Sequence, residues 1–126
     1  MKSALDNNRP IYLQIKETIE NDILNGRIAP EEQIPSNSQL VNHYNINPVT
    51  VMKGINLLVD EGIIYKKRGL GMYVSHDAPE KLKNRFSQAF FKEQIEPLAA
   101  LAKPLGFTLR EIHEMIASAW KGEKND

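Results

Sequence analysis

The chain has 126 residues, no cysteine, and 16 basic side chains balanced by 16 acidic ones. The lack of cysteine excludes disulfides, thiol chemistry and a thiolate zinc site, and the lack of an apolar run of about 18 residues excludes a membrane-spanning helix. Residues 1–10 contain no apolar signal core, so we expect a cytoplasmic protein. Zero net charge disfavours binding to nucleic acid by overall charge, although a local basic patch can still hold phosphates.

The first predicted helix begins after Pro10 and ends at Asn25-Gly26. Its apolar residues recur at helical spacing and form one stripe, which consists of Tyr12, Ile15, Ile19 and Ile23. A single stripe of this kind indicates a helix that packs against other elements. Residues 27–34 form a connector, in which we expect Gln33-Ile34 to pair as a short edge strand.

A short helix is predicted to begin at Asn37. Ser36 and Gln39 have the spacing of a capping box, in which each side chain bonds to the backbone N–H of the other residue. The buried face of this helix would consist of Leu40, Val41 and Tyr44. Asn45 tolerates the left-handed conformation that ends a helix, so the helix is only about two turns long.

A second helix is predicted to follow at once. Asn47 is a good N-cap, Pro48 suits the first helical position, and Gly62 closes the helix. Two helices joined by such a tight turn form a helix-turn-helix, whose second helix enters the DNA major groove. The side chains that lie off its buried stripe are Pro48, Val49, Thr50, Met52, Lys53 and Asn56. Because Val49 and Met52 are apolar, they either read thymine methyl groups or pack inside because the helix is rotated.

A β-hairpin is predicted beyond this helix. Residues 63–65 and 72–74 are β-branched, apolar or aromatic, and the KKRGLG segment between them is a glycine-bearing loop of hairpin type. A two-stranded ribbon after a helix-turn-helix makes a winged helix, and Gly69 and Gly71 would let the backbone of its tip approach a groove closely. The basic residues of the ribbon are Lys66, Lys67 and Arg68. They either contact DNA or only solubilise an edge ribbon.

The C-terminal part is predicted to contain two amphipathic helices. The first starts near Asp77 and is bent or split by Pro97, and the second starts at a capping box formed by Thr108 and Glu111. Two helices cannot close a core of their own, and leaving their large apolar side chains in water would forgo roughly 1.5–3 kcal/mol for each. We therefore predict that a second copy of the chain covers Phe86, Phe90, Leu98, Leu101, Ile112, Ile116 and Trp120. Alternatively, these side chains line a ligand cavity.

These elements define an α+β fold that is mostly helical, with a winged helix-turn-helix domain at residues 1–76 and a dimerisation region at residues 77–126. No P-loop, GxSxG or HExxH motif occurs, so we do not expect an enzyme. The three histidines, His43, His76 and His113, are scattered and lack partners at a metal-ligand spacing. We therefore predict neither a metal nor a cofactor.

Residues 10–75 resemble the DNA-binding domain of the GntR family of bacterial transcription regulators. The segments that carry the resemblance are PIYLQI at 10–15, PS at 35–36, Thr50-Val51 with Lys53-Gly54, the Asp60-Glu61-Gly62 turn, and GLGMYV from residue 69. The Asn47-Pro48 pair and the short two-helix C-terminal part resemble its YtrA-like branch. The chain also departs from the family, since Ser38 and Pro48 stand where arginine is usual and Glu31 stands where glycine is usual.

The resemblance implies a dimeric winged-helix repressor of a small operon, often a transporter operon, without a large effector domain. Its partner would be double-stranded DNA with an inverted-repeat operator. The predicted DNA contacts are Ser36, Ser38, Asn47, Pro48, Val49, Thr50, Lys53, Lys66, Lys67, Arg68, Gly69 and Gly71. Two alternatives remain open, namely a winged helix used for protein–protein contact and a regulator with a small-molecule site in its C-terminal helices.

Overall fold

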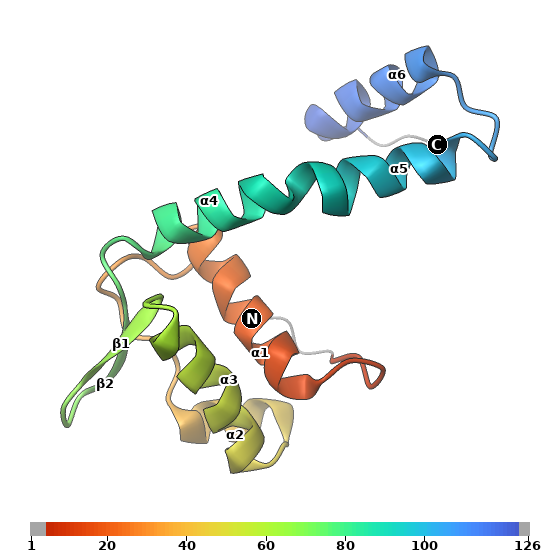
Figure 1. Cartoon of the computed structure of the whole chain (residues 1–126). Helices are drawn as coiled ribbons and strands as arrows, with labels where there is room; N and C mark the ends of the chain where they lie inside the picture. Colours follow the sequence, from red (N-terminus) through yellow and green to blue (C-terminus); the bar gives the residue numbers. More distant parts are fainter. Residues whose placement is uncertain (1–4, 124–126) are drawn as a thin grey trace. The chain divides into compact units, whose positions relative to one another are not determined.

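The computed structural model describes residues 5–123. Its elements in chain order are α1 (Ile11–Leu24), α2 (Asn37–Tyr44), α3 (Pro48–Asp60), β1 (Ile64–Lys67), β2 (Gly71–Val74), α4 (Ala78–Phe90), the π-helical segment η1 (Phe91–Ile95), α5 (Glu96–Ala102) and α6 (Leu109–Trp120) (Figure 1). They fall into two compact units, one ending at Arg85 and the other starting at Phe86. The mostly helical fold with one small sheet confirms the predicted class. No helix between residues 5 and 123 is long and apolar enough to cross a bilayer.

The first unit is organised around α3, which packs against both α1 and α2 (Figure 1). Its core includes Ile15, Ile19, Ile23, Leu40, Val51, Ile55 and Leu58 from the helices and Ile63, Ile64 and Val74 from the hairpin region. The predicted stripe of α1 is thus buried, except for the half-buried Tyr12. Gly54 lies where α1 and α3 are close together, since a Cβ atom at this position would lie 2.7 Å from the backbone oxygen of Tyr12. The absence of a side chain at Gly54 therefore lets the two helices pack.

The hairpin pairs β1 with β2 in antiparallel register, with Lys66 opposite Met72 and Lys67 opposite Gly71. The prediction that both lysines lie in the loop is wrong, because they continue strand β1 and pair across the ribbon. The tip of the hairpin is consequently reduced to residues 68–70. Lys66 and Lys67 are the last two residues of β1 and Arg68 is the first residue of the tip, so the three cations lie together at the far end of the hairpin.

The predicted edge strand at Gln33-Ile34 is present as a short addition to the hairpin. Gln33 forms a bridge with Tyr73, and the backbone N–H of Ile34 donates to a carbonyl of β2 at 2.9 Å. Glu31 precedes this strand with φ of 68°, in the left-handed region that favours glycine. Its carboxylate accepts a hydrogen bond from the Tyr65 hydroxyl, and this bond raises the pKa of Tyr65 above its ordinary value. The connector is therefore fastened to the hairpin by both backbone and side-chain contacts.

An ionic cluster around the buried Glu20 fastens the start of α4 to the rest of the first unit. Glu20 is only 1% exposed. Its carboxylate lies 2.9 Å from the Lys16 ammonium and 2.5 Å from the Arg85 guanidinium. The same two cations lie 3.0 and 2.9 Å from the carboxylate of Glu61, just after α3. Leu82 of α4 is fully buried as well. The sequence predicts a division after residue 76, whereas the first unit continues to Arg85 because these α4 side chains pack and pair within it.

The second unit contains the end of α4 together with η1, α5 and α6. Pro97 does not split the predicted long helix, since α4, η1 and α5 follow one another without a loop. A π-helical turn lies just before Pro97 instead, where the proline has no N–H to donate and its ring would obstruct a preceding carbonyl. In η1 the hydrogen bonds span five residues, as in a π-helix, and the N–H of Glu96 donates to the carbonyl of Phe91. The predicted capping box starts α6, with the Glu111 N–H 3.1 Å from Thr108 Oγ1. Among the described residues of this unit only Ala102 is buried, so most of its apolar surface is exposed.

Candidate nucleic-acid interface

Local capping fixes where α2 begins and ends. The Gln39 N–H donates to Ser36 Oγ at 3.1 Å, and the Ser36 N–H donates to Gln39 Oε1 at 2.8 Å, which confirms the predicted capping box. Asn45 ends the helix in the left-handed conformation, with φ of 53°. Ser36 and Ser38 are both exposed at this helix start. A helix N-terminus with an exposed polar cap is a suitable site for a phosphate.

The start of α3 is fixed in a similar way. The Val49 N–H donates to Asn47 Oδ1 at 2.8 Å, and Pro48 occupies the first helical turn. Because the turn between the two helices is so short, α3 begins as soon as α2 has ended. The order and spacing of the elements are those of a helix-turn-helix.

One face of α3 is buried and the opposite face is exposed. The buried side chains and backbone belong to Val51, Gly54, Ile55 and Leu58. Val49 is 73% exposed and Met52 is 41% exposed, so α3 is not rotated to place either of them in the core. Lys53 is exposed and Thr50 is half-buried on the same side. The face that the sequence predicts for base contacts is therefore accessible.

The Lys53 side chain is oriented by an aromatic ring of α1. Its ammonium lies 4.1 Å from the centroid of the Tyr12 ring. A cation–π contact at an exposed site contributes about 0.5–1 kcal/mol, which limits the rotamers of a long side chain yet can be exchanged for a phosphate or a base. The sequence places Tyr12 only in the packing stripe of α1. Its contact with Lys53 depends on how α1 packs across α3, which cannot be predicted from the local sequence.

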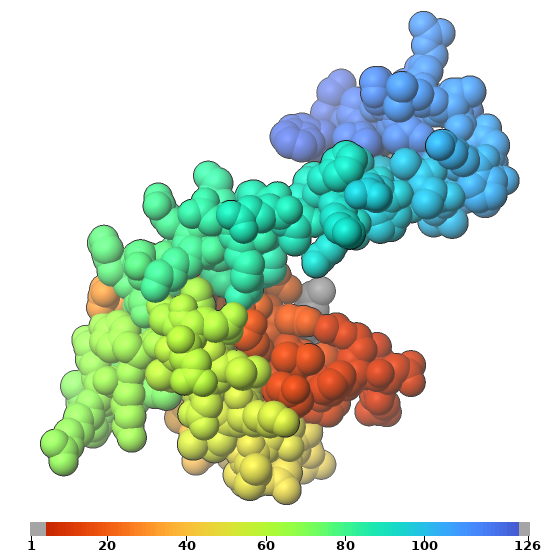
Figure 2. Space-filling view, in the orientation of Figure 1, coloured from red at the N-terminus to blue at the C-terminus, as the bar shows by residue number. Residues whose placement is uncertain are grey.

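The hairpin projects from the first unit as a narrow ribbon (Figure 2). Lys66 and Arg68 are exposed. Lys67 is half-buried, with its ammonium 4.3 Å from the ring centroid of Tyr73 and 5.9 Å from that of Tyr65. Lys66 and Arg68 thus extend freely, whereas Lys67 packs on the two tyrosines.

Of the two glycines predicted to approach DNA, Gly69 lies in the tip of the hairpin and Gly71 is the first residue of β2. Gly69 has φ of 77° and Gly71 has φ of 114°, so the turn itself favours glycine at both positions. A Cβ atom at Gly69 would meet no atom within 4 Å, but one at Gly71 would lie 2.5 Å from the Gln33 side chain. The glycine at position 71 therefore makes room for Gln33, a contact that sequence reasoning missed.

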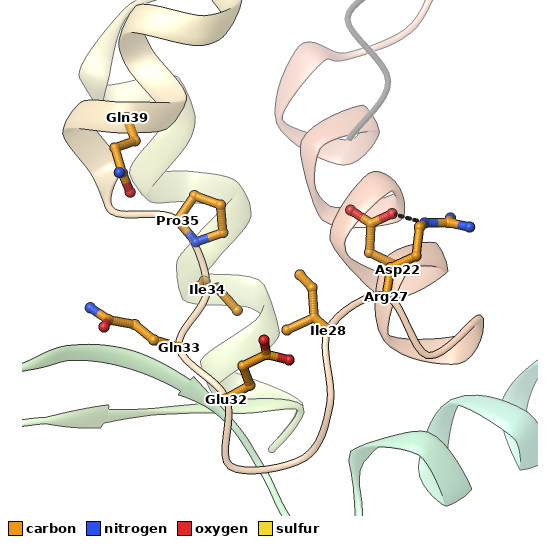
Figure 3. A pocket seen from close by; sticks show the side chains of 8 residues that line it. All are labelled: Asp22, Arg27, Ile28, Glu32, Gln33, Ile34, Pro35 and Gln39. Atoms are coloured by element: carbon orange, nitrogen blue, oxygen red, sulfur yellow. Dashed lines mark hydrogen bonds and ion pairs between the residues drawn. The ribbon is translucent and has the colours of Figure 1, made fainter.

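A groove of about 560 Å³ lies beside the start of α2 (Figure 3). It is lined by Asp22, Arg27, Ile28, Glu32, Gln33, Ile34, Pro35 and Gln39. The cation among these residues, Arg27, lies 2.7 Å from the carboxylate of Asp22. Since Glu32 adds a further negative charge, the groove is unsuited to the DNA backbone.

The side chains predicted for the dimer interface lie in the second unit, in two settings. Leu98, Ile112 and Ile116 line an apolar groove of about 310 Å³ between α5 and α6. Phe90, Leu101 and Trp120 are 55%, 62% and 88% exposed, and Phe86 is half-buried. Large exposed apolar side chains concentrated in a small unit are typical of a surface that binds a partner.

A helix-turn-helix with an accessible second helix, followed by a basic ribbon, defines the first unit as a winged helix-turn-helix domain of a DNA-binding protein. Residues 11–74 match the family described as bacterial regulatory proteins, gntR family. The chain therefore belongs to the GntR family, and it is a DNA-binding transcription regulator.

The relatives extend this result to the C-terminal helices. The chain is 36% identical over 121 residues to the HTH-type transcriptional repressor YtrA of Bacillus subtilis. This match covers 93% of this chain and 92% of YtrA. This confirms the predicted YtrA-like branch. The transcriptional repressor NagR of Bacillus subtilis is 35% identical over 57% of this chain, but the match covers only 30% of NagR. The chain likewise spans only 27% of the Bacillus subtilis regulator YurK.

Solved structures agree with the fold of each part. A GntR family transcriptional regulator from Listeria monocytogenes, 27% identical, superposes with a TM-score of 0.73 over 90% of this chain and 98% of that one. The DNA-binding domain of AraR in complex with an operator, 31% identical, superposes with a TM-score of 0.52 over 60% of this chain and 94% of that one. The winged helix-turn-helix fold is thereby confirmed.

Proposed function

We propose that the protein is a dimeric repressor that binds an inverted-repeat operator, with α3 in the major groove and the hairpin beside it. The observation that carries the proposal is the exposed face of α3 with Lys53, opposite a fully buried face. The operator complex of the similar AraR domain and the repressor YtrA support it. A repressor must reach bacterial DNA, so the proposal also places the protein in the cytoplasm and assigns it no catalytic role.

The proposal gives different tasks to the exposed residues of the first unit. Ser36 and Asn47, at the helix starts, hold phosphates and set the register of the protein on DNA. Lys53 and Thr50, with the methyl groups of Val49, meet base edges. Ser38 and Pro48 occupy neighbouring positions but carry no charge. Lys53 is therefore the main cationic reader of bases on α3.

Lys53→Ala and Thr50→Ala are expected to weaken operator binding without loss of folding, because neither side chain belongs to the core. A good base contact is worth about 1–3 kcal/mol, so the variant that loses one should bind about tenfold or more weakly. The measurement is a titration of the DNA upstream of the protein's own gene, with the site located by footprinting. Lys83→Ala, which removes an exposed lysine of α4, is the matched control. Parental affinity for both α3 variants would contradict the assigned orientation of α3.

Replacing Lys66 and Arg68 by alanine is expected to weaken binding to all duplexes to a similar extent, because the proposal pairs both side chains with phosphates. Each lost phosphate contact should lower the slope of log affinity against log salt by roughly 0.9. Lys67→Ala should change the slope less, since its ammonium packs on Tyr73. A slope that stays constant in the Lys66/Arg68 double variant would show that the ribbon does not touch the DNA backbone.

A further inference from the structure

The tip of the hairpin carries an apolar side chain in a basic surrounding. Leu70 lies between Gly69 and Gly71 and is 63% exposed. Its backbone N–H donates to the Lys67 carbonyl at 2.9 Å and closes the turn. Arg68, two residues before it, is exposed as well. An exposed leucine forgoes the stabilisation that burial of its apolar surface would give, so a leucine at this position indicates contact with a partner.

Gln33 fixes the backbone of this tip. Its side-chain amide donates to the carbonyl oxygen of Leu70 at 2.8 Å. The connector strand that holds Gln33 is itself bonded to β2 through the bridge to Tyr73. Figure 3 shows the Gln33 side chain extending away from the ion pair of Asp22 and Arg27. Because a Cβ atom at position 71 would lie 2.5 Å from the Gln33 amide nitrogen, the contact also depends on Gly71.

The position of the hairpin relative to α3 indicates which part of DNA the tip reaches. β1 follows α3 after residues 61–63 and contacts it, so the ribbon starts beside the helix that the proposed function places in the major groove. A major groove is bordered by a phosphate strand, and the minor groove lies beyond that strand. The exposed cations Lys66 and Arg68 suit the phosphates, and the tip then extends into the minor groove.

A leucine in the minor groove can distinguish A·T from G·C pairs because its side chain has no hydrogen-bond acceptor. A·T and T·A pairs present only acceptors on the floor of this groove, whereas a G·C pair adds the 2-amino donor of guanine. The methyl groups of Leu70 cannot accept a hydrogen bond from that donor, and they would displace the water that does. Apolar side chains, leucine among them, are used by other proteins in this groove.

We propose that Leu70 is a specificity-determining residue that favours A·T pairs where the tip meets the minor groove, and that Gln33 positions it. This inference rests on the proposed function, because it requires the hairpin to lie on DNA. Leu70 contributes apolar contact and no charge, which distinguishes its role from that of Arg68.

The test uses the full chain and a duplex that it selects from a randomised library, with the base pairs under the tip located by footprinting. One such pair is changed to G·C or to inosine·C, because inosine keeps the major-groove edge of guanine but lacks its 2-amino group. The parent should bind the A·T and inosine·C duplexes about equally and the G·C duplex about tenfold more weakly. Leu70→Ala should bind all three duplexes within about twofold of one another, with the same salt slope as the parent.

Gln33→Met tests the positioning role, since methionine has a similar length but no donor. It should abolish most of the G·C discrimination at an unchanged melting temperature, and adding it to Leu70→Ala should have no further effect. Leu24→Ala and Gln88→Met, at exposed positions of α1 and α4, should keep the parental discrimination. Equal parental binding to G·C and inosine·C duplexes would overturn the role of Leu70. If Gln33→Met keeps the full discrimination against G·C, the positioning role of Gln33 is wrong. If the parent selects no duplex from the library, the proposed function itself is refuted.

Discussion

Leu101→Glu is expected to dissociate the proposed dimer into monomers and to weaken binding to a two-site operator by about 100-fold, because the second site then loses its high effective concentration. Leu101 is 62% exposed in the second unit, so the substitution should leave that unit folded. In a two-fold symmetric dimer the change occurs twice, and each copy loses the burial of a leucine, worth roughly 1.5–3 kcal/mol, and gains a carboxylate that must leave water.

Sedimentation velocity and operator titrations measure this effect. The parent should sediment as a dimer at micromolar concentration, and the variant should bind an isolated half-site as tightly as the parent does. Gln94→Glu is the matched control, because it adds the same charge at an exposed position without removing apolar surface. Half-sites should be about 10 base pairs apart or a multiple of that distance. A monomeric parent at these concentrations would remove the dimer from the proposed function.

Trp120 offers an independent measure of the same equilibrium. It is 88% exposed in the single chain, so its fluorescence in a monomer should resemble that of tryptophan in water. If it lies in the interface, as the sequence predicts, its emission should shift to the red when the protein is diluted.

Features encoded in short segments could be predicted from the sequence. The capping boxes of Ser36 with Gln39 and of Thr108 with Glu111 form as expected, because each involves residues three positions apart. Asn45 likewise ends α2 in the left-handed conformation. Local hydrogen bonding and backbone preference decide these features, so they need no knowledge of the rest of the chain.

Features that join distant segments could not be predicted in this way. The ion pairs of Glu20 link α1 to α4, and the ring of Tyr12 reaches Lys53 only because α1 crosses α3. Gln33 contacts Leu70 across a separation of 37 residues. In the candidate interface, the exposed face of α3 was visible from its periodicity, but the partners that orient its lysine and the hairpin tip were not.

The extent of the hairpin shows a related limit. The residues KKRGLG have the composition of a loop, but Lys66 and Lys67 pair with β2. Lysine has a low preference for strands, and the register of the ribbon overrides that preference. Lys66 and Lys67 are consequently strand residues next to the tip, and Arg68 shares the tip with the apolar Leu70.

Gly54→Val is expected to destabilise the protein by roughly 3 kcal/mol, because overpacking at a rigid contact costs about 1–3 kcal/mol and β-branching adds crowding within the helix. The new Cβ atom would lie 2.7 Å from the Tyr12 backbone oxygen, and a backbone atom cannot move aside by a change of rotamer. The helices α1 and α3 would have to separate, so operator affinity should fall together with stability.

Gly54→Ala decides between two opposing effects at the same position. Alanine improves helix propensity over glycine by about 1 kcal/mol, whereas the contact with Tyr12 opposes any added carbon. We expect the contact to dominate, so that this variant also melts below the parent, though by less than Gly54→Val. Asn56→Ala, at an exposed position of the same helix, should melt at or slightly above the parental temperature. A rise in melting temperature for Gly54→Ala would show that α1 and α3 can move apart at little cost and that the close contact does not fix the position of α3.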